Sequence, residues 1–137
     1  MKAFALAVVL PAMLAGCIPA PHRVPLVPAL SGVVTRAGQP VAGAGVTASY
    51  GVGERHEVDL GVTDAQGRFA APGRKDFRML RMMGDPLFDW RVVIHAQGGE
   101  VTGYRDRGIG YPPARADLDC DLDRTAGPVC DLRSQTP

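Results

Sequence analysis

The 137-residue chain lacks an excess of charge of either sign. It has 15 Lys and Arg residues against 14 Asp and Glu residues. Without residues 1–16, which are interpreted below as a signal peptide, Lys2 is absent and 14 residues of each sign remain. A neutral protein has no electrostatic attraction for a phosphate backbone, so the composition argues against nucleic acid as a partner. Beyond residue 15 the sequence also lacks an apolar run long enough to cross a bilayer as a helix.

Residue types that commonly perform chemistry are few and scattered. His22, His56 and His95 do not show the spacing of a metal site, and a Cys-x-x-C redox motif is absent. The three serines lack the glycine-flanked turn that exposes a nucleophile. We therefore expect no metal, no cofactor and no catalytic residue, which means that the protein is not an enzyme.

The first 17 residues, MKAFALAVVLPAMLAGC, have the order of a secretory signal peptide. Lys2 precedes an apolar run over residues 3–15, which is too short to remain as a membrane span. The run ends in LAGC, which resembles the bacterial lipobox. This resemblance implies a signal peptide over residues 1–16 and acylation of Cys17, with several acyl chains giving stable membrane anchoring. Because Ile18 rather than aspartate follows Cys17, we expect the outer membrane, with the protein facing the periplasm.

Residues 17–29 are rich in proline, with four prolines at positions 19, 21, 25 and 28. Such a segment favours extended polyproline II and does not form a core. We therefore predict a stiff tether that would reach roughly 35–40 Å at ~3 Å per residue. The folded domain is then predicted to occupy residues 30–137.

From residue 30 onward the sequence alternates apolar and polar residues in short runs divided by glycine-rich turns. The period of two is typical of half-buried strands, and repeated strands at this spacing indicate an antiparallel sandwich. We predict an all-β protein with a transthyretin-like or immunoglobulin-like β-sandwich. The predicted strands lie within residues 31–36, 46–50, 58–63, 68–70, 90–96 and 101–104. Residues 37–44 and 63–67 are predicted to be turns, and residues 97–99 are predicted to join the strands at 90–96 and 101–104 in a hairpin.

Two stretches of the first half resemble a known domain family. They are GVVTRAGQPVAGAGV (residues 32–46) and VTDAQGRF (residues 62–69), and they are similar to the carboxypeptidase regulatory-like domain, a transthyretin-like sandwich. The resemblance implies the fold and places Phe69 at a sealed end of the sandwich. Members of that family serve as binding or stabilising modules, so it implies an architecture rather than an activity.

The stretch ADLDCDLD, residues 116–123, alternates aspartate with Leu118, Cys120 and Leu122. In a strand, the apolar side chains would face the core and the aspartates would face solvent. An exported protein is expected to bridge two cysteines, and we predict a disulfide between Cys120 and Cys130 across a hairpin turn. The alternative is a loose calcium site, since hard cations prefer clustered carboxylates. Its ligands would be Asp117, Asp119, Asp121 and Asp123.

Two further segments concentrate arginine beside aromatic or methionine residues. Residues 74–84 predict a short inserted helix, because three arginines would share one stripe opposite Phe77, Leu80 and Met83. Residues 105–117 predict a long Gly/Pro loop, and loops of that length are commonly functional. The candidate partner or ligand residues are Arg74, Arg78, Arg81, Trp90, Tyr104, Arg105, Arg107 and Tyr111.

Taken together, these patterns predict a non-enzymatic lipoprotein of the bacterial envelope. Its β-sandwich would act as a binding or scaffold module for a periplasmic protein partner. The alternative is a module that binds glycan or cell-wall material through Trp90, Tyr104, Tyr111 and the arginine-rich loop. In the simplest structural interpretation, the 74–84 helix closes one end of the sandwich and contacts no partner.

Overall fold

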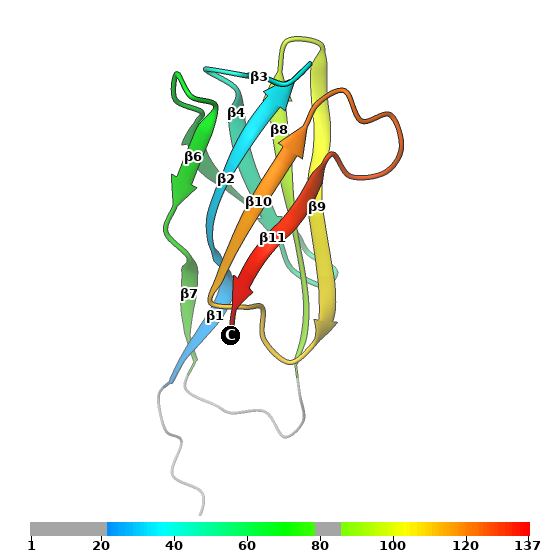
Figure 1. The fold of residues 1–137 in the computed structure, drawn as a ribbon. Coiled ribbons are helices and arrows are strands. Elements are labelled where there is room, and N and C mark those ends of the chain that lie inside the picture. Colours follow the sequence, from blue (N-terminus) through cyan, green and yellow to red (C-terminus); the bar gives the residue numbers. More distant parts are fainter. Residues whose placement is uncertain (1–21, 79–85) are drawn as a thin grey trace, which may run out of the picture.

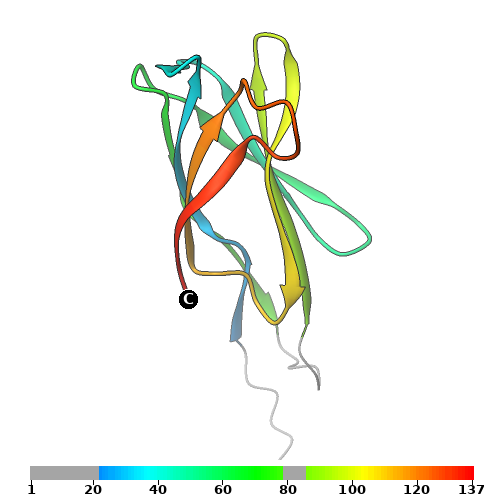
Figure 2. The ribbon, with the colours of Figure 1, turned by 45° about the vertical axis from the view of Figure 1, so that its right-hand side comes forward.

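The computed structural model of the chain describes residues 22–78 and 86–137, which form two facing β-sheets and a small two-stranded ribbon (Figures 1 and 2). Within these ranges no helix is long and apolar enough to cross a membrane. The strands are β1 (His22–Val27), β2 (Ala29–Arg36), β3 (Gln39–Pro40), β4 (Gly45–Tyr50), β5 (His56–Val62), β6 (Arg68–Ala71), β7 (Arg74–Arg78), β8 (Leu87–Ala96), β9 (Gly99–Ile109), β10 (Arg115–Asp121) and β11 (Cys130–Thr136).

The predicted all-β sandwich is confirmed. One sheet has the strand order β5-β4-β8-β9, and the other has the order β11-β10-β2-β3 with β6 also paired to β2. All pairings are antiparallel except that of β2 with β10, which is parallel and was not predicted. The ribbon consists of β1 and β7 and extends beyond the two sheets at one end (Figure 1).

The core lies between the inner faces of the two sheets. Alternate residues of the central strands are buried there, as the period of two predicts. Trp90 is the largest of the fully buried side chains, at 1% exposure. Around it, the core contains Val34, Val46, Ala48, Val92, Ile94, Leu118 and Cys120.

Gly32 allows an aromatic ring to pack directly on the backbone of β2. A Cβ atom at this position would lie 2.6 Å from the carbonyl oxygen of Leu118 and 2.7 Å from Cε1 of Phe69. Both distances are far below van der Waals contact, so a side chain cannot fit without displacing β10 or the ring. Phe69 itself is buried, at 5% exposure.

The TDAQGRF stretch forms a tight turn between β5 and β6, as predicted. The Thr63 hydroxyl donates to the carbonyl oxygen of Val41 at 2.6 Å and accepts from the backbone N–H of Ala44 at 2.9 Å. The Asp64 carboxylate accepts from the backbone N–H of Arg68, which holds the pKa of Asp64 below its ordinary value. The Thr63 hydroxyl thus joins the turn to the β3–β4 connection, and the Asp64 carboxylate closes the turn itself.

The predicted inserted helix is wrong where the structure describes it. Residues Arg74–Arg78 form strand β7, and residues 79–84 lie outside the described residues. β7 pairs with β1 over its whole length, from Val27 opposite Arg74 to His22 opposite Arg78. The helical spacing of the arginines is thus overridden by a partner strand that is distant in sequence.

The predicted tether is also wrong for residues 22–29. Residues 22–27 form β1, β2 begins at Ala29, and Val24 and Val27 are 7% and 3% exposed. Pro25 is tolerated because β1 belongs to a two-stranded ribbon with a register irregularity between Pro25 and Val27. The folded part therefore begins by residue 22, not at residue 30.

The predicted loop over residues 105–117 is mostly strand. β8 has ten residues, and β9 pairs with it as far as Ile109 opposite Leu87. β10 then begins at Arg115, so residues 110–114 alone remain as a loop between β9 and β10. The predicted hairpin across residues 97–99 is confirmed. Its two strands, β8 and β9, are longer than the predicted runs at 90–96 and 101–104.

Candidate binding surfaces

One end of the sandwich collects the segments that the sequence marked as surface. It holds the start of β1, the end of β7, the start of β8, the end of β9 and the 110–114 loop, and both views show these at the bottom (Figures 1 and 2). We call this the lower end. The described chain also enters here, at His22.

The lower end exposes large apolar side chains. Phe77, Leu87, Ile109 and Tyr111 are 60%, 62%, 74% and 45% exposed, and among the described residues only Val52 and Val62 are comparable. Leu87 and Ile109 are direct cross-strand neighbours. Exposed apolar side chains that adjoin one another, as Leu87 and Ile109 do, mark an interaction surface more often than single exposed residues do.

Cationic residues lie beside two of these apolar side chains, Phe77 and Ile109. On the ribbon, Arg23 lies opposite Phe77 and Lys75 precedes it by two residues, which places all three on one face. Arg107 is exposed two residues before Ile109 on β9. Of the predicted surface residues, Arg107 and Tyr111 are exposed at this end, and Arg74 is exposed at the start of β7. Arg78 ends β7, and Arg81 lies outside the described residues.

Trp90 does not belong to a binding surface, contrary to the prediction. It is in the core, and Tyr104 packs against it with ring centroids 5.4 Å apart. Burial of Tyr104 raises the pKa of its hydroxyl, and the charge of Asp106 adds to this effect. The indole Nε1 of Trp90 is a buried donor without a hydrogen-bond partner among the described residues. The two aromatic residues thus fill the core instead of forming an exposed platform.

Arg105, another predicted contact residue, is held in an ion pair on the outer face of the β5-β4-β8-β9 sheet. Its Nη2 lies 2.5 Å from Oδ2 of Asp89, and Nη2 of Arg55 lies 3.1 Å from the same oxygen. The hydrogen bond from Arg105 is the main cause that holds the pKa of Asp89 below its ordinary value. The ion pair of Arg105 therefore links β9 to β8, and the ion pair of Arg55 links the β4–β5 loop to β8.

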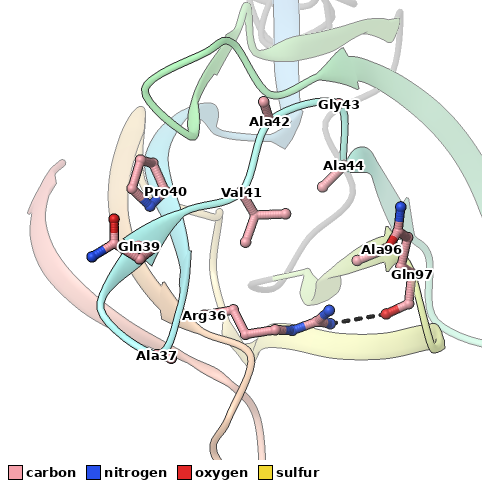
Figure 3. A pocket seen from close by; sticks show the side chains of 10 residues that line it. All are labelled: Arg36, Ala37, Gln39, Pro40, Val41, Ala42, Gly43, Ala44, Ala96 and Gln97. Carbon is pink, nitrogen blue, oxygen red and sulfur yellow. Dashed lines mark hydrogen bonds between the residues drawn. The ribbon is translucent and has the colours of Figure 1, made fainter.

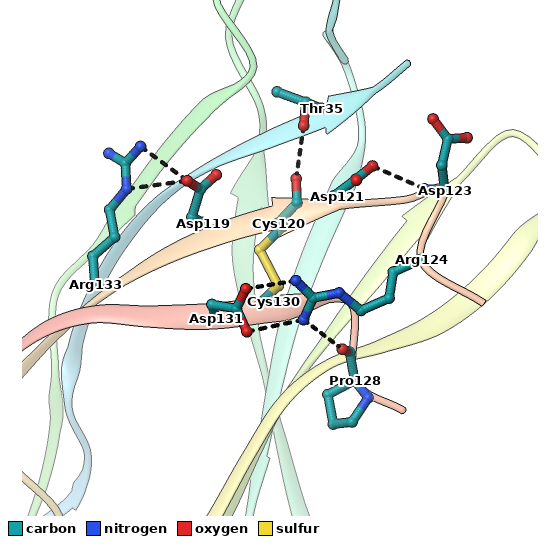
Figure 4. A network of polar contacts seen from close by, with 10 residues as sticks. All are labelled: Thr35, Asp119, Cys120, Asp121, Asp123, Arg124, Pro128, Cys130, Asp131 and Arg133. Atoms are coloured by element: carbon teal, nitrogen blue, oxygen red, sulfur yellow. Dashed lines mark hydrogen bonds and ion pairs between the residues drawn. A yellow bond between two sulfur atoms is a disulfide. The ribbon is translucent and has the colours of Figure 1, made fainter. Parts of the chain in front are cut away.

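The aspartates of β10 face away from the core, as the alternation predicts, because Ala116, Leu118 and Cys120 are buried between them. Each carboxylate has its own polar partner, and no group of three Asp, Glu, His or Cys side chains converges within residues 22–78 and 86–137. The contacts join Asp119 to Arg133 and Asp121 to the Asp123 N–H (Figure 4). They also join Asp117 to the Ser31 hydroxyl and Asp123 to the Ala37 N–H.

The predicted disulfide between Cys120 and Cys130 is confirmed (Figure 4). The two cysteines are direct partners in the β10–β11 pairing, and both are buried. A Cβ atom on Gly103 of β9 would lie 3.0 Å from Sγ of Cys130, so the bridge packs closely against the opposite sheet. Beside the bridge, Arg124 and Asp131 form an ion pair in which Nη2 of Arg124 lies 2.5 Å from Oδ2 of Asp131.

A cleft of about 490 Å³ lies at the opposite, upper end of the sandwich (Figure 3). The guanidinium of Arg36 crosses it and donates to the carbonyl oxygen of Gln97 at 3.0 Å. The sequence predicted only a turn over residues 37–44. It did not predict the cleft, because residues 96 and 97, which complete the wall, are far away in the chain. Its lining residues are Arg36, Ala37, Gln39, Pro40, Val41, Ala42, Gly43, Ala44, Ala96 and Gln97.

Comparisons with known proteins define a family but no activity. No curated protein and no solved structure matches the chain. A family model described as a domain of unknown function (DUF6795) matches residues 30–124. The match runs from β2 to the turn after β10 and leaves β1 and β11 outside it. The chain therefore belongs to the family of the domain of unknown function DUF6795.

Proposed function

We propose that the protein is a non-enzymatic lipoprotein of the bacterial envelope that presents its β-sandwich to a periplasmic protein partner. The observation on which the partner surface rests is the position of the upper cleft. β1 begins at His22, at the lower end, whereas the ends of β2 and β8, which contribute residues to the cleft, lie at the opposite end (Figure 1). An acyl anchor on Cys17 would leave the cleft facing away from the membrane, where a periplasmic protein can reach it. The lipobox-like LAGC and the resemblance to the carboxypeptidase regulatory-like domain support this proposal.

The lining of the cleft suits a protein segment. Small apolar side chains such as Ala44 and Ala96 leave room for a side chain of the partner, and Arg36 adds a positive charge at the wall. The floor is rigid because Thr63 holds the backbone of both Val41 and Ala44. Loops fixed on a rigid sandwich commonly form binding surfaces, and Arg favours a carboxylate as its partner. An exposed loop with an acidic residue is the segment that fits best.

The glycan alternative is less well supported. It requires exposed aromatic rings on which sugars can stack, but Trp90 is buried and Tyr104 packs on it. Of the three aromatic residues predicted for that role, Tyr111 is the one with an exposed side chain. Cosedimentation with peptidoglycan tests this alternative directly, since a glycan module would be retained on the pellet.

In-cell crosslinking of the full lipoprotein tests the proposed partner surface. Ala42→Trp places a large ring at the cleft and should remove most of the crosslinked periplasmic protein without changing the melting temperature. Ala70→Trp, at an exposed alanine of β6, is the matched control and should retain the complex. Unchanged capture with Ala42→Trp would show that the cleft is not the partner surface.

The anchor needs its own test. Cys17→Ser should abolish the incorporation of labelled palmitate, because the thiol that is acylated is then missing. Incorporation that survives this substitution would refute the lipoprotein assignment.

A further inference from the structure

The distance from the proposed lipid to the fold is short. Cys17 precedes His22 by five residues, and five fully extended residues span at most about 18 Å. The free tether predicted from the prolines would have reached twice as far, but residues 22–29 belong to the fold. An acylated Cys17 would therefore hold the lower end within this short distance of the bilayer surface.

The side chains at the lower end have the chemistry of a membrane interface. Phe77 and Tyr111 are exposed aromatic residues, and Leu87 and Ile109 form an exposed aliphatic pair. Aromatic rings are favoured at the headgroup level of a bilayer, and aliphatic side chains gain by leaving water. Val62, on β5 at the upper end, is the comparable exposed aliphatic residue far from this surface.

The charges at the lower end also suit a lipid surface. Arg23 and Lys75 flank Phe77 on the exposed face of the ribbon, and Arg107 lies near Ile109. Cations beside a bilayer are attracted by anionic headgroups and strengthen binding that begins with an apolar contact or a lipid chain.

We propose that the lower end rests on the membrane surface, with Phe77, the Leu87–Ile109 pair and Tyr111 in the interface and Arg23, Lys75 and Arg107 at anionic headgroups. This inference relies on the proposed acylation of Cys17. The lipid and the lower end then form two attachments, which stop the sandwich from tumbling about its anchor. The upper cleft is held pointing into the periplasm, so a partner meets it in one orientation.

Quenching of tryptophan fluorescence by brominated lipid chains tests the contact. The full-length lipidated protein is reconstituted into vesicles that contain phosphatidylglycerol, with either Ile109→Trp or Val62→Trp. The tryptophan at position 109 should lose roughly half of its emission, because its ring reaches the interface. The tryptophan at position 62 should keep its emission. The native Trp90 is 1% exposed, and its signal is subtracted with the unsubstituted protein.

Charge reversal tests the role of the cations in the same assay. Arg23→Glu with Lys75→Glu should weaken the quenching at position 109, whereas Arg68→Glu with Arg124→Glu, away from the lower end, should leave it unchanged. If the protein floats with the vesicles but positions 109 and 62 are quenched equally or not at all, the membrane contact is refuted and the lipoprotein assignment stands. A protein that fails both to float and to take up palmitate refutes the assignment, and this inference with it.

Discussion

The β10–β11 hairpin and the β1–β7 ribbon are both antiparallel pairs, yet they are held in different ways. The hairpin lies within a five-stranded sheet, with Leu118 and Cys120 fully buried and a disulfide that packs on the opposite sheet. The ribbon pairs only with itself and buries chiefly Val24 and Val27. Its outer face instead exposes Phe77 between two cations.

The difference separates stability from surface chemistry. Most of the free energy of unfolding that these two elements contribute should come from the hairpin, because burial of apolar area is the main stabilising term. The ribbon, which has few buried contacts, is free to expose apolar and cationic side chains without a large loss of stability. The candidate binding surface at the lower end therefore lies on an element that has few buried side chains, so its residue types are little restricted by packing.

Leu118→Ala should have the largest effect. Removal of a fully buried leucine from the hairpin leaves a cavity and should lower the free energy of unfolding by about 2–5 kcal/mol. Phe77→Ala on the ribbon removes a larger side chain that is 60% exposed and should change it by no more than about 0.5 kcal/mol. Denaturant unfolding measures both, and equal losses would contradict the comparison.

Removal of the disulfide should rank second. Cys120→Ala with Cys130→Ala opens an eleven-residue loop and should lower the free energy of unfolding by roughly 2–3 kcal/mol. The unsubstituted protein should lose a similar amount when a reductant is added, whereas the double variant should not respond. A reductant that leaves the unsubstituted protein unchanged would show that the bridge does not stabilise the hairpin.

Two valine substitutions compare the ribbon with the sheet by the same chemical change. Val34→Ala in β2, at 0% exposure, should lower the free energy of unfolding by about 1.5–3 kcal/mol. Val24→Ala in β1 should cost less than about 1 kcal/mol, and should mainly speed amide hydrogen exchange in β1 and β7. Exchange that accelerates equally in β2 and β10 would show that the ribbon and the sheets unfold together.

The smallest effect is expected from pH. The hydrogen bond from Arg124 holds the pKa of Asp131 below its ordinary value, so the folded-state pKa is lower than the unfolded-state value of about 3.9. The pair then stabilises the hairpin above that value, and its contribution is lost as the pH falls through the folded-state pKa. Asp131→Asn should make the loss of stability in acid less steep. Arg124→Gln should have the same effect, and the double variant should add nothing further.

The features predicted correctly are those that local spacing controls. The alternation of residues 116–123 identified which side chains are buried, and the separation of Cys120 from Cys130 was sufficient to predict their pairing. The TDAQGRF turn was also predicted, because its Asp, Thr and Gly act on the backbone of the turn and its nearest loop. Each of these features depends either on contacts between residues close in the chain or on the alternation of apolar and polar residues within a single strand.

The features predicted wrongly depend on a partner distant in sequence. The arginines at positions 74 and 78 have a helical spacing, but pairing with β1 makes the segment a strand. The prolines indicated a free tether, although the same ribbon uses residues 22–27. Trp90 was placed among surface residues because its pattern does not tell whether the apolar face of β8 meets the core or a ligand.

The sequence by itself determined the all-β class, the disulfide, the acidic outer face of β10 and the lipobox-like start. Only the tertiary structure decided that β2 and β10 run parallel and that residues 22–27 belong to the fold. It also decided that Phe77, Leu87, Ile109 and Tyr111, but not the exposed Val62, lie at the end where the chain enters. The physical reason is that period and turn chemistry act within a few residues, whereas strand partners and shared ends arise from contacts across the whole chain. The position of the lower end beside residue 22, and of the cleft opposite, follows from those contacts alone.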